Sequence, residues 1–326
     1  MIDNSNLKIG FIGVGYLGEI HLKRFLQIAE KNKGINISGI YDINPNRSND
    51  VSNNYKVKPY DDYTTLIAES DGIILATTSD THYRIAKKVL DNSKHLFVEK
   101  PITTNSIDAN DLVQTAKEKN LTLQVGHIER FNPAYSVVKT LIQNPLFIEL
   151  ERIAPFKKRG SEVAVVFDLM IHDIDLLLDL IGEMPQSLFS RNVEAISGSA
   201  DMAFASLSFS DNRTGIIKTS RLSVKPSRKM RVFQKDGYLS VDFAKGEVDY
   251  LSLSKPEYPS QMISAGDNLN YYFAQIIPDK VDQISLELED FISSIRDNRP
   301  PLVSGTDGLN ALKVAEDILK ANKLTI

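Results

Sequence analysis

The sequence of 326 residues contains no cysteine. Disulfide bonds, thiolate metal sites and cysteine nucleophiles are therefore excluded. An excess of positive charge is missing as well, because 38 lysine and arginine residues stand against 42 aspartate and glutamate residues, for a formal net charge of −4. Nucleic-acid-binding surfaces are usually basic, so we expect no nucleic acid among the partners. The lack of cysteine also fits a reducing compartment, and we expect a cytoplasmic protein.

Long hydrophobic runs are absent too. Nowhere do about 18 consecutive apolar residues occur, which argues against a membrane span or a membrane partner. The opening residues, MIDNSNLK, lack a basic segment that leads into an apolar run, so we expect no signal peptide. The composition is that of ordinary globular proteins, with 42% hydrophobic and 25% charged residues. The length favours two domains, since single cores stop growing near ~250 to 300 residues.

Apolar runs and helical patterns alternate in the first part of the chain. The expected strands are 8–14, 35–42, 72–77, 95–100 and 121–126. Since these runs are apolar on both faces and helical patterns lie between them, they predict an α/β domain with a doubly wound parallel sheet over residues 1–126. The Asn- and Ser-rich stretch 44–54 is expected to be a loop.

The pattern changes after residue 126. Helices are expected over 132–142 and 166–182, and the stretch 187–253 alternates like an antiparallel meander with turns at DNRTG, KDG and AKGE. Two further helical patterns, SLELEDFISSIRD and TDGLNALKVAEDILKAN, follow it. We therefore expect residues 127–326 to form an α+β domain whose sheet could cover a substrate cleft or a subunit partner. The closing helices could pack back on the first domain.

The stretch KIGFIGVGYLG, residues 8–18, combines an apolar run with three glycines and leads into a helical pattern. In such a strand, turn and helix, Gly13 can take the backbone angles of a tight turn, Gly15 lets the main chain approach a pyrophosphate, and Gly18 lets the helix pack on its strand. Free amides at the start of the helix would face the phosphate charge. The alternative is a plain turn, but the context favours a dinucleotide site.

Asp42 ends the second expected strand, 24 residues after Gly18. This is near the ~20-residue offset of the acid that binds an adenosine ribose. A carboxylate there accepts hydrogen bonds from both ribose hydroxyls and repels a 2′-phosphate, so we predict NAD in preference to NADP, although Arg47 could offer a phosphate contact. The alternative is that Asp42 only starts a turn.

The stretch ATTSDTHY, residues 76–83, follows an expected strand and enters a helical pattern. It therefore lies at the carboxyl edge of the sheet, where ligands of this architecture bind. Thr77 and Thr78 are candidate contacts for the ribose and the phosphates. In the alternative, the next three residues only cap the helix.

Glu99, Lys100 and Pro101 come at the end of the expected strand HLFVEK. The proline restricts Lys100 to an extended conformation that aims it out of the sheet edge. An ammonium held there could stabilise an alkoxide as a hydroxyl loses its proton and hydride. The alternative for such a lysine is a solvated charge.

Asp168 and His172 lie four residues apart in DLMIHDID, and a helix would place them on one face. A neutral imidazole can accept a hydroxyl proton near neutral pH, and a positioned base of this kind contributes ~10² to 10⁴ in rate. Asp168 could orient the ring or hold a substrate. The alternatives are a surface ion pair or a helix cap. Two ligands are too few for a metal site, and none is expected.

In their order and spacing, these motifs resemble the Gfo/Idh/MocA family of sugar oxidoreductases over nearly the whole chain. The motifs are Gly13-Val14-Gly15-Tyr16-Leu17-Gly18, Thr77 with His82, Glu99-Lys100-Pro101, and Asp168 with His172. The resemblance implies a Rossmann domain followed by an α+β domain with an open, mostly antiparallel sheet for substrate binding and oligomerisation. It also implies a homodimer or homotetramer formed through that sheet. The glycine-rich run that family members place before the Asp/His helix is missing, with VAVVFDLM in its place.

The resemblance further implies an NAD-dependent dehydrogenase and gives individual residues their roles. Lys100, Asp168 and His172 become the catalytic set, with His172 or Lys100 relaying the proton. The residues expected to bind the cofactor are Gly13, Val14, Gly15, Tyr16, Leu17, Gly18, Asp42, Ile43, Thr77, Thr78, His82, Glu99 and Lys100. The residues expected to contact substrate are Lys100, His127, Arg130, Lys157, Arg159, Asp168 and His172.

Within the family, VGHIERFNP and VVFDLMIHDID are similar to a subgroup that oxidises the 3-hydroxyl of UDP-N-acetylglucosamine to a ketone. That ketone precedes transamination, in the supply of aminated sugar for lipid A, so a sugar aminotransferase would be a functional partner. A nucleotide sugar carries two phosphate charges, and positive side chains should line its site, which is why Arg130, Lys157 and Arg159 are candidates. The alternatives are a solvated KKRG loop and, for His127, a core histidine.

Two other functions stay open. A dehydrogenase of the same family could act on a cyclitol, an aldose or another substrate. The fold also hosts non-catalytic dinucleotide-binding regulators. The presence of Lys100, Asp168 and His172 together argues against a regulator, because a sensor needs the phosphate loop but no proton relay.

Overall fold

The computed structural model describes residues 6–158, 160, 163–264 and 270–321. The chain divides into two compact units. The first unit comprises Met1–Ile128 and Asp282–Leu309, and the second comprises Glu129–Val281 and Asn310–Ile326. Each unit has a hydrophobic core of its own.

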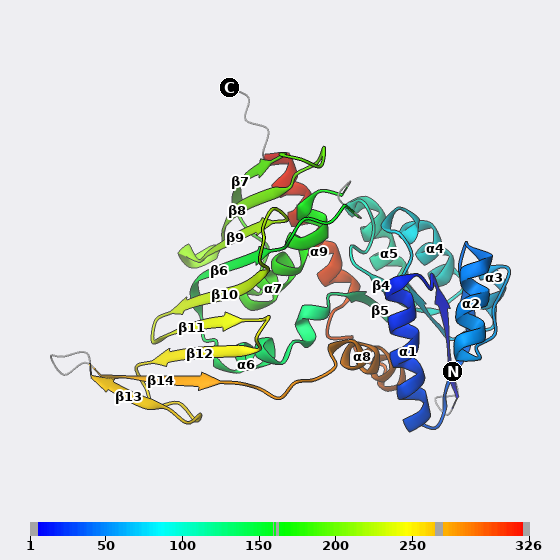
Figure 1. The fold of residues 1–326 in the computed structure, drawn as a ribbon, viewed down its shortest axis with the longest axis horizontal. Helices are drawn as coiled ribbons and strands as arrows, with labels where there is room; N and C mark the ends of the chain where they lie inside the picture. Colours follow the sequence, from blue (N-terminus) through cyan, green and yellow to red (C-terminus); the bar gives the residue numbers. More distant parts are fainter. Residues whose placement is uncertain (1–5, 159, 161–162, 265–269, 322–326) are drawn as a thin grey trace. The chain divides into compact units, whose positions relative to one another are not determined.

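A sheet of five described strands forms the centre of the first unit, in the order β2-β1-β3-β4-β5 (Figure 1). The strands are β1 Leu7–Ile12, β2 Ile35–Tyr41, β3 Gly72–Leu75, β4 His95–Glu99 and β5 Leu123–Gly126. All neighbouring strands pair in parallel, which confirms the predicted fold class of this part. The strand order reverses between β1 and β3, and open α/β sheets bind ligands at the carboxyl ends of strands at such a point.

Helices cover this sheet, and one of them comes from far along the chain. They are α1 Tyr16–Lys31, α2 Pro45–Tyr55, α3 Tyr63–Ala68, α4 Ser79–Asp91, α5 Ser106–Glu118 and α8 Gln283–Asp297. Helix α8 packs beside α1, and its Phe291 shares a core with Phe25 of α1 and Phe97 of β4. The rings of Phe97 and Phe291 meet edge to face, 6.0 Å between centroids, a favourable aromatic geometry. The first unit is therefore discontinuous in sequence.

The expectation of a loop over 44–54 is wrong, because residues Pro45–Tyr55 form α2. Asn44 caps this helix by accepting hydrogen bonds from the backbone amides of Asn46 and Arg47. Pro45 lies in the first turn, where a missing N–H costs nothing. Val51 is fully buried in the core of the unit. Capping and this burial outweigh the low helix propensity of the Asn- and Ser-rich sequence.

Nine described strands form the sheet of the second unit, in the order β13-β14-β12-β11-β10-β6-β9-β8-β7 (Figure 1). The strands are β6 Pro145–Ile153, β7 Ser187–Val193, β8 Met202–Ser208, β9 Thr214–Ser220, β10 Ser227–Gln234, β11 Gly237–Asp242, β12 Glu247–Ser252, β13 Gln261–Ser264 and β14 Asn270–Ile276. Only β6 and β9 pair in parallel, so the sheet is mostly antiparallel, as predicted. The sequence patterns did not predict β6, β13 or β14.

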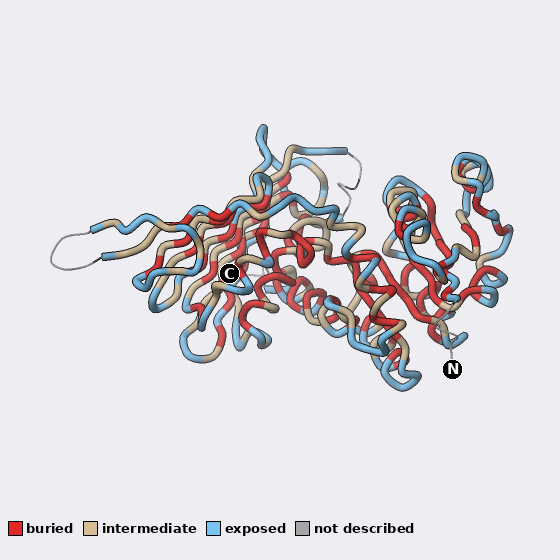
Figure 2. The backbone as a smooth tube through the Cα atoms, turned by 90° about the horizontal axis from the view of Figure 1, so that it is seen from below, coloured by how far each residue is buried: buried red, intermediate tan, exposed pale blue. Residues whose placement is uncertain are grey.

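Helices pack on one face of this sheet. They are α6 Pro133–Leu141, α7 Ile171–Ile181 and α9 Gly305–Ala321, of which the part from Asn310 belongs to this unit. The shorter turns are 3-10 turns at Ile128–Phe131 and Ser210–Asn212 and a π-helical turn at Val166–Met170. The tube in Figure 2 alternates between buried and more exposed positions along the strands, as expected for a sheet covered on one side.

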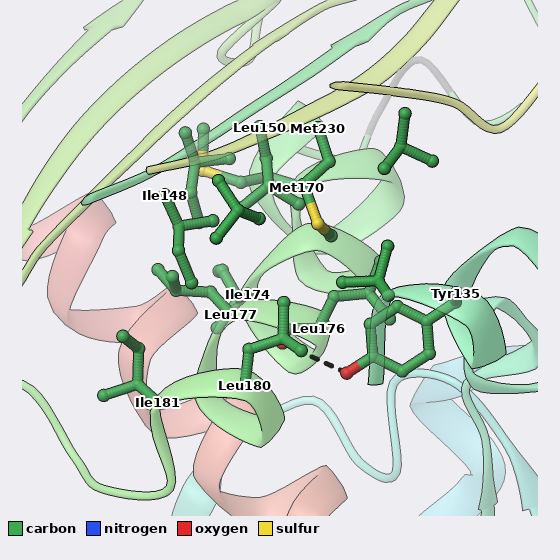
Figure 3. Close-up of a cluster of buried hydrophobic side chains, with 14 of the residues drawn as sticks. Tyr135, Ile148, Leu150, Met170, Ile174, Leu176, Leu177, Leu180, Ile181 and Met230 are labelled. Atoms are coloured by element: carbon green, nitrogen blue, oxygen red, sulfur yellow. Dashed lines mark hydrogen bonds between the residues drawn. The ribbon is translucent and has the colours of Figure 1, made fainter. Parts of the chain in front are cut away.

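The core between α7 and the sheet is shown in Figure 3. Met170 of the π-helical turn lies with Leu150 of β6 and Met230 of β10, all three fully buried. The hydroxyl of Tyr135 donates to the Asp179 carboxylate and lies 3.5 Å from the Leu176 carbonyl. The π-helical turn and the helix that follows it thus share one apolar core with α6 and the sheet. Across the described ranges, no helix is long and apolar enough to cross a membrane.

Candidate active site

The glycine turn connects β1 to α1. Gly13 has φ +85°, a left-handed conformation that favours glycine. A Cβ at Gly13 would lie 2.7 Å from the carbonyl oxygen of Ala76, and one at Gly18 would collide with the carbonyl of Gly13. Around the Cβ position of Gly15, by contrast, the structure describes no neighbouring group within 4 Å. Gly13 and Gly18 permit the tight turn, and the open space at Gly15 fits the approach of a pyrophosphate.

Asp42 lies beside this turn, at the carboxyl end of β2. Its Oδ2 accepts a hydrogen bond from the Val14 amide at 2.9 Å, and its Oδ1 accepts one from the Asn44 amide at 3.0 Å. Asp42 therefore starts a turn, as the alternative interpretation has it, and its role as the ribose-binding acid stays a prediction. The neighbouring Ile43 is 86% exposed, which leaves its side chain available to pack on a bound group.

Arg47 of α2 reaches back to the same turn. Its Nε donates to the Val14 carbonyl at 2.8 Å, and its guanidinium pairs with Glu19 of α1. The hydrogen bond from Arg47 holds the pKa of Glu19 below its ordinary value. Because its charge is balanced by Glu19, we assign Arg47 to bracing the loop in preference to binding a 2′-phosphate.

The loop after β3 lies against the glycine turn. A Cβ at Gly13 would also approach the methyl of Thr77 to 2.7 Å. His82 of α4 is buried, with Nδ1 2.9 Å from the Pro101 carbonyl oxygen and Nε2 3.2 Å from the Thr77 carbonyl oxygen. Burial lowers the pKa of His82, which favours a neutral ring. A neutral ring has a single N–H, so His82 donates to one of these two carbonyls and lies against the other, between the Thr77 loop and the segment that follows Lys100. Thr78 occupies the N-cap position of α4.

Lys100 directly follows β4, at the same carboxyl edge of the sheet as the glycine turn. Its peptide bond to Pro101 is cis. The Lys100 amide donates to Oε2 of Glu99 at 3.2 Å, and Oε1 of Glu99 lies 2.6 Å from Nε2 of His21. Glu99, expected among the cofactor contacts, is buried beneath the strand end.

The Asp/His pair belongs to the second unit. Asp168 lies in the π-helical turn Val166–Met170, and His172 lies in the first turn of α7. Both side chains are half-buried. A π-helical turn is wider than an α-helical one and frequently occurs at functional sites, so the two side chains are not spaced as in the regular helix that the sequence predicted.

Two buried arginines anchor α7. Arg152 of β6 pairs with Asp173 at 2.8 Å and with Glu129 at 2.9 Å. Arg130 donates to both carboxylate oxygens of Asp175, at 2.6 and 2.8 Å. Planar two-pronged contacts of this kind are the strong form of arginine ion pair. They fix the helix that carries His172.

The predicted substrate contacts fall into different surroundings. Arg130, expected at a phosphate, is 5% exposed and also pairs with Asp179 at 2.7 Å, which favours an anchoring role. His127 is buried in the first unit, Lys157 is exposed, and Arg159 lies outside the described residues.

The structure brings Asp42 and Thr77 to the glycine turn, and all the predicted cofactor residues lie within the first unit. Lys100 belongs to that unit as well, whereas Asp168 and His172 belong to the second. The full catalytic set therefore stays a prediction.

Sequence reasoning missed His21, Glu287, Glu129 and Arg152. His21 follows Gly18 by three residues, and its place on an otherwise apolar helix face was a usable signal. Glu287 occupies a buried position of α8, where the helical pattern calls for an apolar residue. Glu129 and Arg152 gave no such signal, because only the folded chain shows that they are paired.

Comparison with known proteins gives the same fold. Residues 7–127 match the oxidoreductase family with an NAD-binding Rossmann fold, GFO_IDH_MocA, and residues 154–323 match the C-terminal alpha/beta domain of that oxidoreductase family. The chain is 31% identical to UDP-N-acetylglucosamine 3-dehydrogenase of Acidithiobacillus ferrooxidans over 95% of both chains. It is 24% identical to myo-inositol 2-dehydrogenase of Thermotoga maritima, over 94% of this chain and 93% of that one.

Solved structures of other proteins have the same fold. The crystallised UDP-N-acetylglucosamine 3-dehydrogenase of Acidithiobacillus ferrooxidans superposes with a TM-score of 0.88, at 30% identity and with 97% of each chain covered. A levoglucosan dehydrogenase in complex with NADH shares the fold, with a TM-score of 0.85 over 97% of each chain at 15% identity. With its glycine turn, its lysine at the end of β4 and both family domains in place, the chain belongs to the Gfo/Idh/MocA family of NAD-dependent oxidoreductases.

Proposed function

We propose that this protein oxidises a secondary hydroxyl of a sugar to a ketone, and that the substrate is the 3-hydroxyl of UDP-N-acetylglucosamine. The structural observation that carries the proposal is the position of Lys100, which follows β4 at the same sheet edge as the glycine turn. The 31% identity to a UDP-N-acetylglucosamine 3-dehydrogenase supports the choice of substrate.

The first unit would hold the cofactor around its glycine turn. The amides at the start of α1 and the open space at Gly15 suit the pyrophosphate, and Asp42 suits the ribose hydroxyls. When bound, NAD supplies the acceptor for the hydride that leaves the substrate carbon. Since a carboxylate repels a 2′-phosphate, kcat/KM should be higher with NAD than with NADP. Equal values for the two cofactors would contradict this role of Asp42.

Lys100 and His172 would handle the proton of the substrate hydroxyl. The ammonium of Lys100 stabilises the developing alkoxide, and a neutral imidazole at His172 accepts the proton. Asp168 would orient the imidazole or hold the substrate. For the phosphates of a nucleotide sugar, Lys157 is the exposed candidate, and Lys157→Ala should raise KM for a UDP-sugar but not for a free sugar.

The catalytic roles are tested by Lys100→Ala and His172→Ala. Each should lower kcat by about 10² to 10⁴ because a proton-handling group is removed. The Kd for NADH, followed by fluorescence titration, should stay near that of the wild type. Near wild-type turnover in both variants would refute the catalytic assignment.

Gly15→Ala tests the cofactor site and contrasts with the two catalytic variants, which should keep their affinity for NADH. The Cβ position at Gly15 has no described neighbour within 4 Å, so the free protein should keep its Tm. A methyl group there would occupy the space that we assign to the pyrophosphate, and the Kd for NADH should rise at least tenfold, a loss of about 1.4 kcal/mol. Unchanged NADH binding would place the phosphates elsewhere.

The substrate is tested by NADH formation with a panel of UDP-sugars, free sugars and myo-inositol. A sugar aminotransferase and an amino donor, present in each assay, would pull an unfavourable ketone equilibrium forward. No turnover of UDP-N-acetylglucosamine under these conditions would remove the substrate proposal. Turnover of myo-inositol alone would favour the cyclitol alternative, which the 24% identity to a myo-inositol 2-dehydrogenase supports. NADH binding without any turnover would favour a regulator.

We also propose a homodimer or homotetramer formed through the sheet of the second unit, and functional coupling to an aminotransferase. Sedimentation of the purified protein tests the first of these. The second is tested by the rate gained when the aminotransferase is present in the assay above.

A further inference from the structure

Three ionisable side chains meet beneath the end of β4. They are His21 of α1, Glu99 of β4 and Glu287 of α8, and they all belong to the first unit. His21 and Glu287 are 1% exposed and Glu99 is 8% exposed. One ligand-type atom from each lies within 4.8 Å of the others. Such groups are rarely this deeply buried unless they interact, so the cluster needs a physical account.

The geometry of the cluster distinguishes a shared proton from a shared metal ion. The shortest contact joins Nε2 of His21 to Oε1 of Glu99, at 2.6 Å. Ligand atoms lie about 2.0 to 2.2 Å from a zinc ion, so two ligands of one tetrahedral ion would be roughly 3.3 Å apart. A separation of 2.6 Å fits a short, charge-assisted hydrogen bond.

The two carboxyl groups of the cluster differ in protonation. Burial alone would raise the pKa of Glu99, but the hydrogen bond from His21 and the nearby charges outweigh it, so the pKa is lowered and Glu99 is ionised. Since a carboxylate has no proton to give, Nε2 of His21 is the donor. Burial, reinforced by the charge of Glu99, raises the pKa of Glu287 well above its ordinary value. Glu287 is therefore a neutral carboxylic acid.

The Glu99 carboxylate is fixed on both sides. Its Oε1 accepts from His21, and its Oε2 accepts the backbone amide of Lys100 at 3.2 Å. A Cβ at Gly126 of β5 would come within 2.8 Å of Oε2, so glycine at that position makes room for the carboxylate. The same carboxylate therefore contacts both the buried histidine and the main chain of Lys100.

We propose that His21 is a positioning residue for Lys100: it orients the Glu99 carboxylate that holds the Lys100 amide, while Glu287 is a neutral neighbour that adds no second charge to the cluster. This role rests on the catalytic function proposed for Lys100. Helix α8 is itself held at the sheet, because the Gln124 side-chain amide donates to the Glu287 carbonyl at 2.9 Å. Helices α1 and α8, which lie far apart in the sequence, thus each contribute a side chain to the cluster beneath Lys100.

The histidine is tested by a matched pair of substitutions. His21→Gln keeps an N–H donor near the position of Nε2, and His21→Leu removes it. We expect His21→Leu to lower kcat by about 10- to 100-fold, the scale of an ångström-sized misplacement. KM and the Kd for NADH should change little, and His21→Gln should recover most of the loss. Equal kcat values for the two variants would overturn the positioning role.

The acids are tested by Glu99→Gln and Glu287→Gln. Glu99→Gln removes the charged acceptor and should lower kcat as His21→Leu does, whereas Glu287→Gln replaces one neutral group by another and should leave kcat close to wild type. Loss of kcat in Glu287→Gln equal to that in Glu99→Gln would overturn the assignment. So would one equivalent of metal in the purified wild-type protein.

A measurement without substrate separates this proposal from the proposed function. Infrared difference spectroscopy should show the carbonyl band of a buried carboxylic acid in the wild type and in Lys100→Ala, and this band should disappear in Glu287→Gln. If Lys100→Ala kept full activity while the band behaved as expected, the proposed function would fail and the protonation of the cluster would stand. Absence of the band in the wild type would refute the neutral state assigned to Glu287, even if the other variants did not fold.

Discussion

The two units stabilise their candidate catalytic residues with different kinds of buried polar cluster. Behind Lys100, the first unit places a histidine, a carboxylate and a neutral acid. Behind the helix of His172, the second unit places two arginines, each paired with carboxylates. The first cluster consists of imidazole and carboxyl groups, which can gain or lose protons. The second is held by guanidinium groups that keep their charge at any physiological pH.

The two clusters differ in whether their charge is permanent. Arg152 is nearly inaccessible, and the neighbouring Asp173 and Glu129 outweigh its burial and raise its pKa above the ordinary value. A permanent charge of this kind suits a fixed anchor for a helix. The cluster under Lys100 contains no arginine and can change its charge, so its contribution to stability depends on pH.

The largest expected effect is on the anchor of the second unit. Arg152→Met would leave Asp173 and Glu129 as buried carboxylates without their shared partner. Removing one member of a buried ion pair costs about 3 to 5 kcal/mol, so the free energy of unfolding should fall by that amount in urea titrations. A loss below 1 kcal/mol would mean that the pairs do not anchor α7.

A smaller loss is expected when the cluster of the first unit is broken. Glu99→Gln takes the charged acceptor from the buried N–H of His21 and should cost about 1 to 3 kcal/mol in the free energy of unfolding. The same urea titration measures it, with Glu287→Gln as the control of equal size. If Glu287→Gln were the more damaging of the two, the assignment of charge within the cluster would be reversed.

The pH dependence of stability should reveal the neutral acid. In the native state Glu287 keeps its proton above the pH at which the unfolded chain releases it, near ~4.3. Unfolding then releases a proton, so this group makes the free energy of unfolding fall as pH rises from there towards its native pKa, by at most about 1.4 kcal/mol per pH unit. Glu287→Gln should therefore gain stability relative to the wild type as pH rises. Parallel pH curves for the two proteins would contradict a raised pKa.

The smallest effect is expected at a surface pair of the second unit. Arg231 and Glu149 form an ion pair at 3.0 Å with both side chains about 40% exposed. Arg231→Met should change the free energy of unfolding by only about 0 to 1 kcal/mol, and added salt should reduce the difference further. A loss as large as that in Arg152→Met would show that burial is not what separates the two sites.

The parallel sheet was predictable because its signals are local. Each of its strands is an apolar run, and two glycines of the turn, Gly13 and Gly18, have a steric reason at their own positions. The helix α2 was missed because one cap at Asn44 outweighed a composition typical of loops. Strand β6 was missed because its partners in the sheet, β10 and β9, follow much later in the sequence. No hairpin turn beside β6 therefore indicated a strand there.

The candidate site was predictable only where a residue acts through its own position. Lys100 and Asp42 follow strands, and that alone places them at the sheet edge. Arg130 was expected at a phosphate, yet its partner Asp175 lies 45 residues away in the chain. Likewise, the contact of His21 with Glu99 spans 78 residues, so the local pattern could single out His21 but not its partner.

The discontinuity of the first unit has a consequence during protein synthesis. A ribosome delivers all five strands of the parallel sheet once residue 126 has emerged, but α8 begins only at Gln283. Until then Phe25 and Phe97 lack their partner Phe291, and an apolar face of the nascent domain stays open to solvent or to chaperones. A fragment that ends at residue 128 would lack this wall of its core, so the cofactor-binding half should be aggregation-prone when expressed alone.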